Sequence, residues 1–389
     1  MIPIGVHIKT ESPLMLAANS SAHNLVETLE FIPGNSIRGA LARRYLEKGG
    51  KAEDPVFRRL FLTGEVRFGF GRINGGQIIP LSARTCKYDG GFRVDGGHGV
   101  IDLLLPGEGV MTCPNAQCGR SIDYLKGYWN PISGKQETIH KRLITRTAID
   151  PKRDQASQGR LYSQRVVEED QVFHSVIEAP EKLMNELETL IAMPNVTALG
   201  TGRSKAGSGQ GVGRQSEQMP NVMALGTGRS RGQGWVVLQK GPIDLPDWRT
   251  AEERFARYHD VDGKPVLAVT LLSDAILTDA YLRDRTVPDI SHLTTMGIKK
   301  NEWESKPFRA FAATRKVSGF DGLPLQLPRL KRLAIEAGST FLFRKADSAR
   351  PTIPGGEGVG WIGEKNDEGF GEVILWHAFH IEQEKEMLS

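Results

Sequence analysis

Residues 219–238 read MPNVMALGTGRSRGQGWVVL, a glycine- and arginine-rich phrase that runs directly into an apolar stretch beginning at Trp235. Its first part, up to Ser230, repeats residues 193–204 with a single difference, Met223 for Thr197. Glycines let the main chain approach phosphates closely, and arginines bind them through a charged planar fork. The phrase therefore predicts a loop that holds a nucleic-acid backbone, followed by a strand over 235–238 in which Trp235 belongs to the core.

Length and charge narrow the class of protein. The chain has 389 residues, enough for two domains with separate cores. Its net charge is +4, and basic residues gather in two segments: seven Lys/Arg against two Asp over 140–165, and five against one Glu over 203–231. Such clusters predict an anionic partner. The sequence has neither a long apolar run nor a charged-then-apolar start, which predicts a cytoplasmic protein without a membrane span.

The first half of the chain predicts an α+β domain over residues 1–240. The expected elements are a strand over 2–9, a helix capped by Asn35 or Ser36, a hairpin of 65–70 with 77–81, a helix over 180–192 and the strand over 235–238. This is the split βαβ order of ferredoxin-like folds. Residues 84–135 are rich in Gly, Cys and Asp without periodicity, and we interpret them as an insertion into this domain.

The second half, residues 241–389, predicts another version of the same architecture. The expected elements are a strand over 266–272, a helix over 330–337 stopped by Gly338, and strands over 341–343 and 373–379. A second glycine loop, residues 358–371, precedes the last of these strands. Each half thus ends in a glycine loop followed by a strand.

Four stretches resemble the RAMP superfamily of CRISPR-associated proteins, whose members carry one or two ferredoxin-like (RRM-like) domains. The stretches are IPGNSIRGALARRYL from Ile32, RTAIDPKRDQASQGRLYSQ from Arg146, LGTGRSRGQGWV from Leu225 and GVGWIGEKNDEGFGEV from Gly358. Together they span most of the chain. The long two-domain form with a cysteine-bearing insertion is most similar to the Csx-type, Cas-five-like subunit of type III-D effector complexes. The near-exact duplicate of the glycine loop departs from the family pattern: it is either a second cradle or a disordered tandem repeat.

The resemblance implies a function in antiviral defence without catalysis. It implies a structural subunit that binds crRNA near its 5′ handle, beside a large Cas-ten-type subunit and backbone RAMP proteins, and meets target RNA only indirectly. It also implies that residues 140–175 form a basic hairpin that contacts guide bases, for which the alternative interpretation is a solvated charged loop.

The candidate RNA contacts follow from these motifs. They comprise a helix arginine, the hairpin residues and the glycine cradle within 199–234: Arg38, Arg142, Arg146, Arg160, Tyr162, Gly226, Gly228, Arg229 and Arg231. Ordinary packing of an amphipathic helix is the alternative for Arg38. The more acidic second glycine loop, with Glu364 and Glu368, is expected to face protein instead.

The three cysteines of the chain predict a structural zinc site. Cys86, Cys113 and Cys118 fall within one glycine-rich insertion, with His98 between the first two. The insertion is too poor in apolar residues to form its own core, and a tetrahedral Cys₃His zinc site would supply the missing folding energy. The alternative interpretation is three unrelated thiols and a surface histidine, or a fourth ligand other than His98.

The sequence identifies no catalytic constellation. It lacks a P-loop motif, and its glycines precede a strand instead of following one into a helix, which excludes a Rossmann site. A metal-independent crRNA-processing nuclease needs a histidine base beside a lysine or tyrosine, and His140 with Lys141 is the pair to test. Target RNA cleavage would need an aspartate, and Asp95, Asp102 and Asp150 are equivalent by sequence. We expect a binding subunit and keep both nuclease activities as alternatives.

Overall fold

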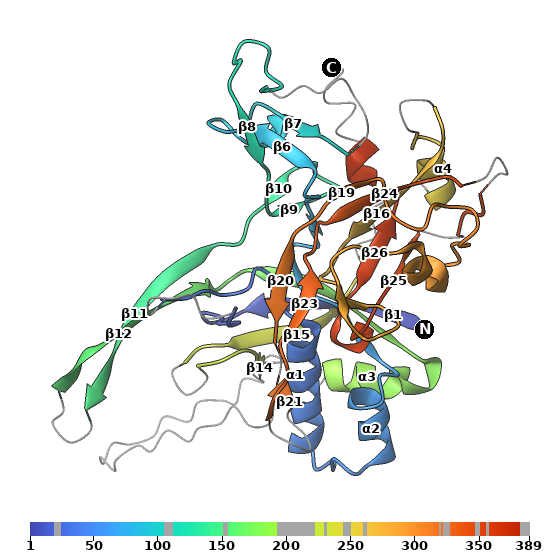
Figure 1. Cartoon of the computed structure of the whole chain (residues 1–389). Helices are drawn as coiled ribbons and strands as arrows, with labels where there is room; N and C mark the ends of the chain where they lie inside the picture. Colours follow the sequence, from blue (N-terminus) through green and yellow to red (C-terminus); the bar gives the residue numbers. More distant parts are fainter. Residues whose placement is uncertain are drawn as a thin grey trace, which may run out of the picture. The chain divides into compact units, whose positions relative to one another are not determined.

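The computed structural model describes residues 1–18, 25–104, 112–150, 155–192, 222–228, 232–243, 250–259, 263–318, 320–321, 327–346, 351–354 and 358–381. The chain has a mixed α+β fold and divides into two compact units (Figure 1). Unit 1 comprises Met1–Val66 and Ile139–Ile243, and unit 2 comprises Arg67–Thr138 and Asp244–Ser389. Among the described residues, no helix is long and apolar enough to cross a membrane.

An antiparallel sheet organises unit 1, with the strand order β14 (Val222–Ala224), β15 (Trp235–Gly241), β1 (Ile2–Thr10) and β13 (Val172–Ala179). The central strand β1 pairs with β13 on one side and with β15 on the other. Because side chains alternate along a strand, Val6 and Ile8 enter the core while His7 lies on the opposite face. The strands predicted over 2–9 and 235–238 are confirmed.

Within its described residues, unit 1 has the helices α1 (Gly34–Glu47), α2 (Pro55–Phe61) and α3 (Glu181–Ala192). Helix α3 buries Leu183, Leu187, Leu190 and Ile191, as the sequence predicts. The predicted cap of α1 is wrong: the N-cap is Pro33, and the helix already includes Asn35 and Ser36. Proline fixes φ and places the chain in the extended conformation from which the helix starts.

A long hairpin extends from unit 1. Strand β11 (Lys141–Asp150) pairs antiparallel with β12 (Gln155–Val167), and Figure 1 shows the pair as a projecting ribbon. Strand β2 (Leu25–Val26) pairs in parallel with β12 near its base. The hairpin expected within 140–175 is therefore present.

The main sheet of unit 2 has the order β19 (Arg309–Phe311), β24 (Thr340–Arg344), β16 (Val266–Leu271), β26 (Glu372–Leu375) and β25 (Val359–Trp361). All six residues of β16 are buried, as expected for a central strand with both faces covered. The strands expected around 266–272, 341–343 and 373–379 are present. The last one ends at Leu375, before Trp376 adopts a φ of 51°.

A small module of unit 2 carries the cysteines. Its sheet has the order β7 (Val100–Asp102), β6 (Ala83–Cys86) and β8 (Ile122–Tyr124), and beside it β5 (Gln77–Ile78), β9 (Tyr128–Trp129) and β10 (Gln136–Glu137) form a second sheet. We call residues 83–104 and 112–126 the cysteine module. One buried cluster joins Ala83, Phe92, Val100 and Leu125 of this module to the neighbouring Ile79 and Trp129 and to the distant Phe379.

The sequence assigns this insertion to the first domain, and the structure places it in unit 2. The reason is the core shared with Phe379, together with a buried contact between Asp102 and His380. Neither partner can be recognised from the sequence around the cysteines, because both lie nearly 300 positions further along the chain.

Two further predictions about secondary structure are wrong. The segment predicted as a helix over 330–337 contains the strand β23 (Arg332–Ile335), which pairs with β20 (Thr314–Val317). The strand β5 does not pair back across Asn74 as the predicted hairpin requires, and its partner is β9.

The remaining elements of unit 2 are short. They are β3 (Arg67–Phe68), β4 (Arg72–Ile73), α4 (Ala251–Phe255), β17 (Leu277–Thr278), β18 (Asp284–Arg285), β21 (Phe320–Asp321), β22 (Leu327–Pro328) and the 3₁₀ turns Arg93–Asp95, Ile290–Met296 and Asn366–Glu368.

Candidate nucleic-acid interface and candidate metal centre

The hairpin brings two of the predicted RNA contacts together. Arg146 on β11 lies directly opposite Tyr162 on β12. Side chains of directly opposed residues lie on the same face of an antiparallel pair, within reach of each other. A guanidinium and a phenol ring on one face can stack on an unstacked base and bind the adjoining phosphate. Arg160 also lies on β12, but its side chain is outside the described part of the structure.

Carboxylates of unit 1 neutralise the basic residues at the base of the hairpin. Lys141 Nζ lies 2.5 Å from Glu30 Oε1, and Arg142 Nη1 lies 3.0 Å from Glu169 Oε1. Arg165 Nη1 lies 3.3 Å from a Glu27 oxygen. The sequence did not reveal these partners because two of the glutamates precede the hairpin by more than a hundred residues. Surface ion pairs of this kind are weak and can exchange for a phosphate.

The described part of the glycine loop uses its glycines to pack against its own chain. Gly226 and Gly228 have φ of 67° and 82°. A Cβ on Gly226 would lie 2.2 Å from the carbonyl oxygen of Met15, and Thr227 N–H donates to the same oxygen at 3.0 Å. The glycines are thus required by the fold, whatever the loop binds. Arg229, Arg231 and the first copy of the repeat lie outside the described residues.

Trp235 corrects an expectation from the sequence. It was expected in the core, and its side chain is 37% exposed. Strand alternation explains the difference, because Val236 and Leu238 take the inward positions of β15 and leave Trp235 on the outer face. Trp235 directly follows the glycine loop, so its exposure favours the other interpretation of this residue, an aromatic ring available for stacking.

The arginines of α1 differ in their roles. Arg44 is buried, and its Nη1 donates to the carbonyl oxygen of Leu190 in α3 at 2.8 Å. Burial lowers the pKa of Arg44 to about 10, and the guanidinium ties the two helices together. Arg38 is half-buried on the same helix, a position that permits either packing or ligand contact.

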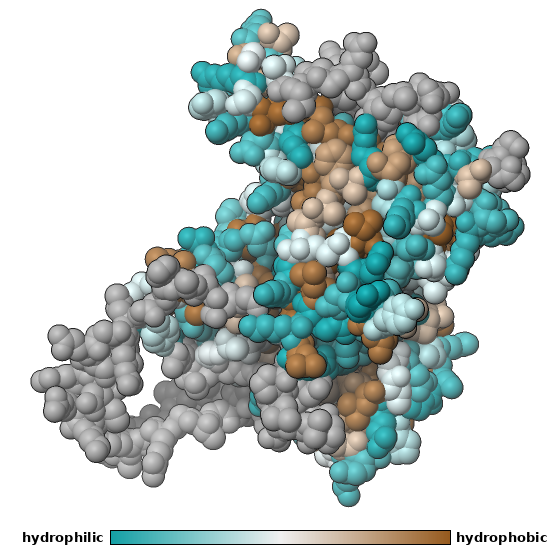
Figure 2. Space-filling model, viewed as in Figure 1, coloured by the Kyte–Doolittle hydropathy of each residue, from teal (hydrophilic) through white to brown (hydrophobic). Residues whose placement is uncertain are grey.

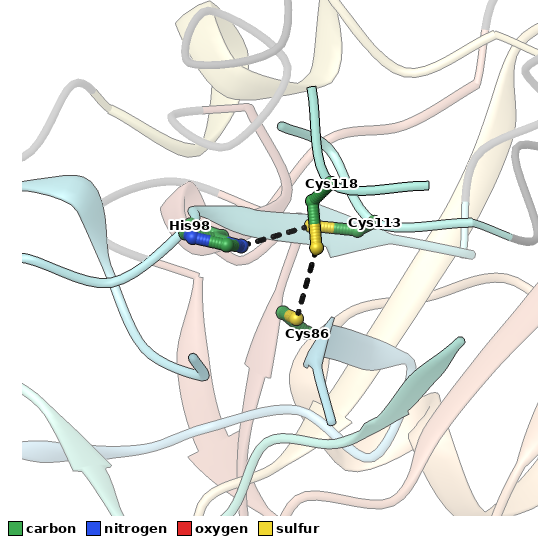
Figure 3. A group of neighbouring side chains, drawn as sticks. All are labelled: Cys86, His98, Cys113 and Cys118. Carbon is green, nitrogen blue, oxygen red and sulfur yellow. Dashed lines mark hydrogen bonds between the residues drawn. The ribbon is translucent and has the colours of Figure 1, made fainter. Parts of the chain in front are cut away.

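The four residues predicted to bind zinc converge in the cysteine module. Cys86 ends β6, His98 precedes β7, and Cys113 and Cys118 precede β8. Their ligand atoms all lie within 4.8 Å of one another, with Cys86 Sγ 3.9 Å from Cys118 Sγ and Cys113 Sγ 3.3 Å from His98 Nδ1 (Figure 3). Thiolates about 2.3 Å from a tetrahedral zinc ion lie about 3.8 Å apart. The donor set and its spacing therefore fit a metal ion.

Backbone groups prepare one thiol of this cluster for a metal. Hydrogen bonds from the backbone of Asp89 and Tyr88 lower the pKa of Cys86 to about 6. Burial raises the pKa of Cys113 to about 11, although the backbone N–H of Asn115 faces its sulfur at 3.4 Å. A metal ion binds thiolates. Cys86 therefore ionises readily, whereas Cys113 needs a nearby cation to become a thiolate.

A carboxylate lies on the side of the histidine ring away from the sulfurs. Asp89 Oδ2 lies 3.7 Å from His98 Nε2 and 3.9 Å from Arg120 Nη1. Because Nε2 faces the carboxylate, Nδ1 is the ring nitrogen turned toward the sulfurs.

The residues considered for catalysis are not assembled. Lys141 is paired with Glu30, while the neighbouring His140 is exposed. Asp102 is buried against His380, and Asp95 Oδ2 accepts the backbone N–H of Gln136. The side chain of Asp150 lies outside the described residues.

Comparisons with known proteins give the following matches. A sequence model of the RAMP superfamily matches residues 7–237, from β1 to β15. Among solved structures, a chain of the type III-B Cmr-beta complex bound to cognate target RNA and AMPPnP is 15% identical, with a TM-score of 0.42 and coverage of 87% of this chain and 86% of that one. Cmr4 (Cas7) of Pyrococcus furiosus is 12% identical, with a TM-score of 0.27 and coverage of 62% and 99%. No curated protein sequence matches the chain.

Proposed function

Because this chain belongs to the RAMP superfamily, we propose that it is a crRNA-binding structural subunit of a type III CRISPR interference complex. In this proposal the chain is the Csx-type, Cas-five-like subunit of a III-D-like complex. It holds the 5′ handle region of the guide and docks the large Cas-ten-type subunit. The observation that carries the proposal, beside the family, is the basic hairpin with Arg146 opposite Tyr162.

The architecture of unit 1 supports a ferredoxin-like domain. Strand β1 lies between β15 and β13, while the helices α1 and α3 follow β1 and β13 along the chain. A split βαβ unit has this arrangement, with the last strand of the domain beside the first. The outer face of such a sheet and the loops beside it are then available to RNA.

We further propose that the cysteine module holds a structural zinc ion through Cys86, His98, Cys113 and Cys118. Three sulfurs and one nitrogen at near-tetrahedral spacing support zinc over harder cations, which prefer oxygen. Four protein ligands leave no open position for a substrate, so the ion stabilises the module and takes no part in a reaction.

A non-catalytic role agrees with the surroundings of the candidate catalytic residues. The Lys141 ammonium is paired with Glu30, so it is not directed at His140. The Asp102 side chain is only 5% exposed and contacts His380, so it has no access to a phosphodiester. The subunit is therefore proposed to leave bound RNA intact.

Affinity purification of the tagged chain from its native host tests the proposal. We expect uniform short RNAs with a common repeat-derived 5′ end, together with a large Cas-ten-type protein, and loss of the RNA in the Arg146→Ala/Tyr162→Ala variant. Arg43→Ala is the matched control, because Arg43 is an exposed arginine of unit 1 paired with Glu47. Recovery of the chain without such RNA would contradict the proposal.

A cleavage assay separates binding from processing. The purified chain is incubated with repeat RNA, and the products are mapped at nucleotide resolution. We expect no cleavage. A cut at one position that disappears in His140→Ala would instead identify a processing nuclease.

A further inference from the structure

Two exposed tyrosines stand out in the cysteine module. The side chains of Tyr88 and Tyr124 are 66% and 56% exposed, so burial of their rings contributes little to the core. Figure 2 shows that the surface at the upper end of the view, over β6 and β8, is mostly hydrophilic. In the sequence, charged residues adjoin both tyrosines: Lys87 and Asp89 flank Tyr88, and Asp123 precedes Tyr124.

An arginine holds the ring of Tyr124 in place. Arg84 lies directly opposite Tyr124 in the β6–β8 pair, and its guanidinium carbon is 3.8 Å from the ring centroid. The guanidinium is itself fixed, because Nη1 donates to the carbonyl oxygens of Leu81 and Ala83, both at 2.8 Å. One face of the ring is covered by the cation, and the side chain still exposes more than half of its surface.

A second arginine lies over the ring of Tyr88. The guanidinium carbon of Arg120 is 4.7 Å from the ring centroid, and Arg120 also faces Asp89. The two pairs therefore share a design in which a cation lies over an exposed phenol ring.

The metal-binding cluster connects both pairs. Arg84 and Tyr88 stand two residues before and two residues after Cys86, and Arg120 stands two residues after Cys118. The backbone of Tyr88 also forms a hydrogen bond with the sulfur of Cys86. Closing the cluster around a metal thus fixes the backbone from which three of the four stacked side chains project.

The charges around the rings suit a polyanion. Lys87 is exposed and directly precedes Tyr88 in the sequence. Two nearby carboxylates already have partners: Asp89 faces His98 and Arg120, and Asp123 accepts the backbone N–H of Tyr124. Aromatic rings beside cations are the means by which proteins bind single-stranded nucleic acid without reading its sequence.

We infer that Tyr88 and Tyr124, backed by Arg120 and Arg84, form a stacking platform for single-stranded RNA on the cysteine module. Bases stack on the open ring faces, and the arginines and Lys87 bind the neighbouring phosphates. The inference rests on the proposed function only in taking RNA as the ligand. It adds a contact site in unit 2 to the one in unit 1.

The test measures binding of a fluorescent twelve-nucleotide oligouridine to the purified full-length chain by anisotropy. We expect Tyr88→Ala and Tyr124→Ala each to weaken binding by about 5- to 150-fold, the range for loss of one base stack. Tyr88→Phe and Tyr124→Phe keep the ring and should retain the wild-type affinity. Tyr281→Ala is the matched control, since Tyr281 is an 80% exposed tyrosine of unit 2 with the Arg283 guanidinium 5.1 Å from its ring.

Zinc content is measured for every variant, so that loss of the module is distinguished from loss of a ring. A second readout uses wild-type protein, with 5-iodouracil in the oligonucleotide and mapping of the photo-crosslinked peptides. Crosslinks at Tyr88 or Tyr124 support the platform.

The other outcomes distinguish failure of the platform from failure of the proposed function. If the module tyrosine variants bind like Tyr281→Ala, or if crosslinks fall only on the hairpin, the platform is wrong while the proposed function stands. If the wild-type chain binds neither this oligonucleotide nor its co-purified RNA, both proposals fail.

Discussion

Arg146 and Tyr162 are cross-strand partners in the β11–β12 hairpin, so a cation and an aromatic ring share one face of a two-stranded ribbon. Two strands alone have a limited core, and a ribbon of this kind is stabilised by pairs of this sort along its faces. For the proposed RNA binding, the pair separates two contributions, because the arginine would contribute charge and the tyrosine would contribute stacking.

The two contributions predict different salt dependences. Arg146→Ala should reduce the slope of log K against log salt by about 0.7, the value for one phosphate of a single strand. Tyr162→Ala should weaken binding by about 1–3 kcal/mol without changing that slope. Anisotropy titrations at several salt concentrations measure both. The same result for Arg43→Ala as for Arg146→Ala would show that only net charge matters.

Removal of the metal should unfold the cysteine module. A strong chelator, or Cys86→Ser, is expected to remove one equivalent of zinc and to cost at least about 2 kcal/mol of stability in unit 2. For a unit of this size that is a fall in Tm of about 4–8 °C. Metal content and calorimetry measure the two effects.

Thr85→Ser is the matched control for the metal experiment. The Thr85 hydroxyl accepts from Gly91 N and donates to the Gly99 carbonyl oxygen, and serine retains that hydroxyl next to Cys86. The proposed site would be contradicted if the chain binds no zinc, or if the chelator leaves its Tm unchanged.

His377 predicts a pH dependence of stability. Burial, followed by the charges of His380, Arg254 and Arg72, lowers the pKa of His377 well below its usual value of 6.5. The unfolded chain therefore binds a proton near pH 6 that the folded chain does not, and stability falls as the pH drops below about 6.5. The slope approaches about 1.4 kcal/mol per pH unit.

Denaturant unfolding between pH 7.5 and 5 measures this slope. His377→Asn should flatten it, because an amide oxygen can still accept the Phe379 N–H that His377 Nδ1 accepts at 3.0 Å. His259→Asn alters an exposed histidine of unit 2 and should leave the slope unchanged. Equal slopes in all three proteins would assign the pH dependence to other groups.

Leu282 predicts a stabilising substitution. It has a φ of 60° in the tight turn between β17 and β18, where Asp279 N–H donates to the Arg283 carbonyl oxygen at 3.0 Å. Its side chain is 81% exposed and gains little from packing. Leu282→Gly should raise stability by about 0.5–1 kcal/mol, because glycine avoids a left-handed penalty of about 1–2 kcal/mol but adds entropy to the unfolded chain.

Thermal unfolding compares Leu282→Gly with Leu330→Gly. Leu330 is similarly exposed, but its φ is not positive, so glycine there should be neutral or destabilising. A lower Tm for Leu282→Gly than for Leu330→Gly would show that the leucine side chain stabilises the turn in a way the backbone angle does not reveal.

Local sequence patterns correctly predicted the elements whose structure depends on residues close together in the chain. Helix α3 follows from the spacing of Leu183, Leu187 and Leu190, and the metal cluster follows from cysteines close together in a segment without a core. In both cases the deciding residues lie within a few turns or loops of one another.

Predictions that depended on distant partners were wrong. The segment around Arg332–Ile335 has helical spacing, but pairing with β20 makes it a strand, because tertiary context overrides a weak local preference. The assignment of the cysteine module to the first domain failed because its core includes Phe379. The prediction that Trp235 lies in the core was wrong because alternate side chains of β15 face opposite sides of the sheet, and Trp235 lies on the outer side.

The discontinuous composition of both units has a consequence for biosynthesis. The central strand β1 leaves the ribosome long before its partners, since Ile2 pairs with Ala179 and Thr10 with Val236. Cys86 and Cys118 are only 32 residues apart, so their thiols can come together early in translation. Asp102 can contact His380 only after another 278 residues have been synthesised. The edges of β1 are therefore unpaired for most of translation, when chaperones can shield them. If the proposed zinc site forms, the metal supply at that stage determines whether the nascent thiols are bound or exposed to oxidation.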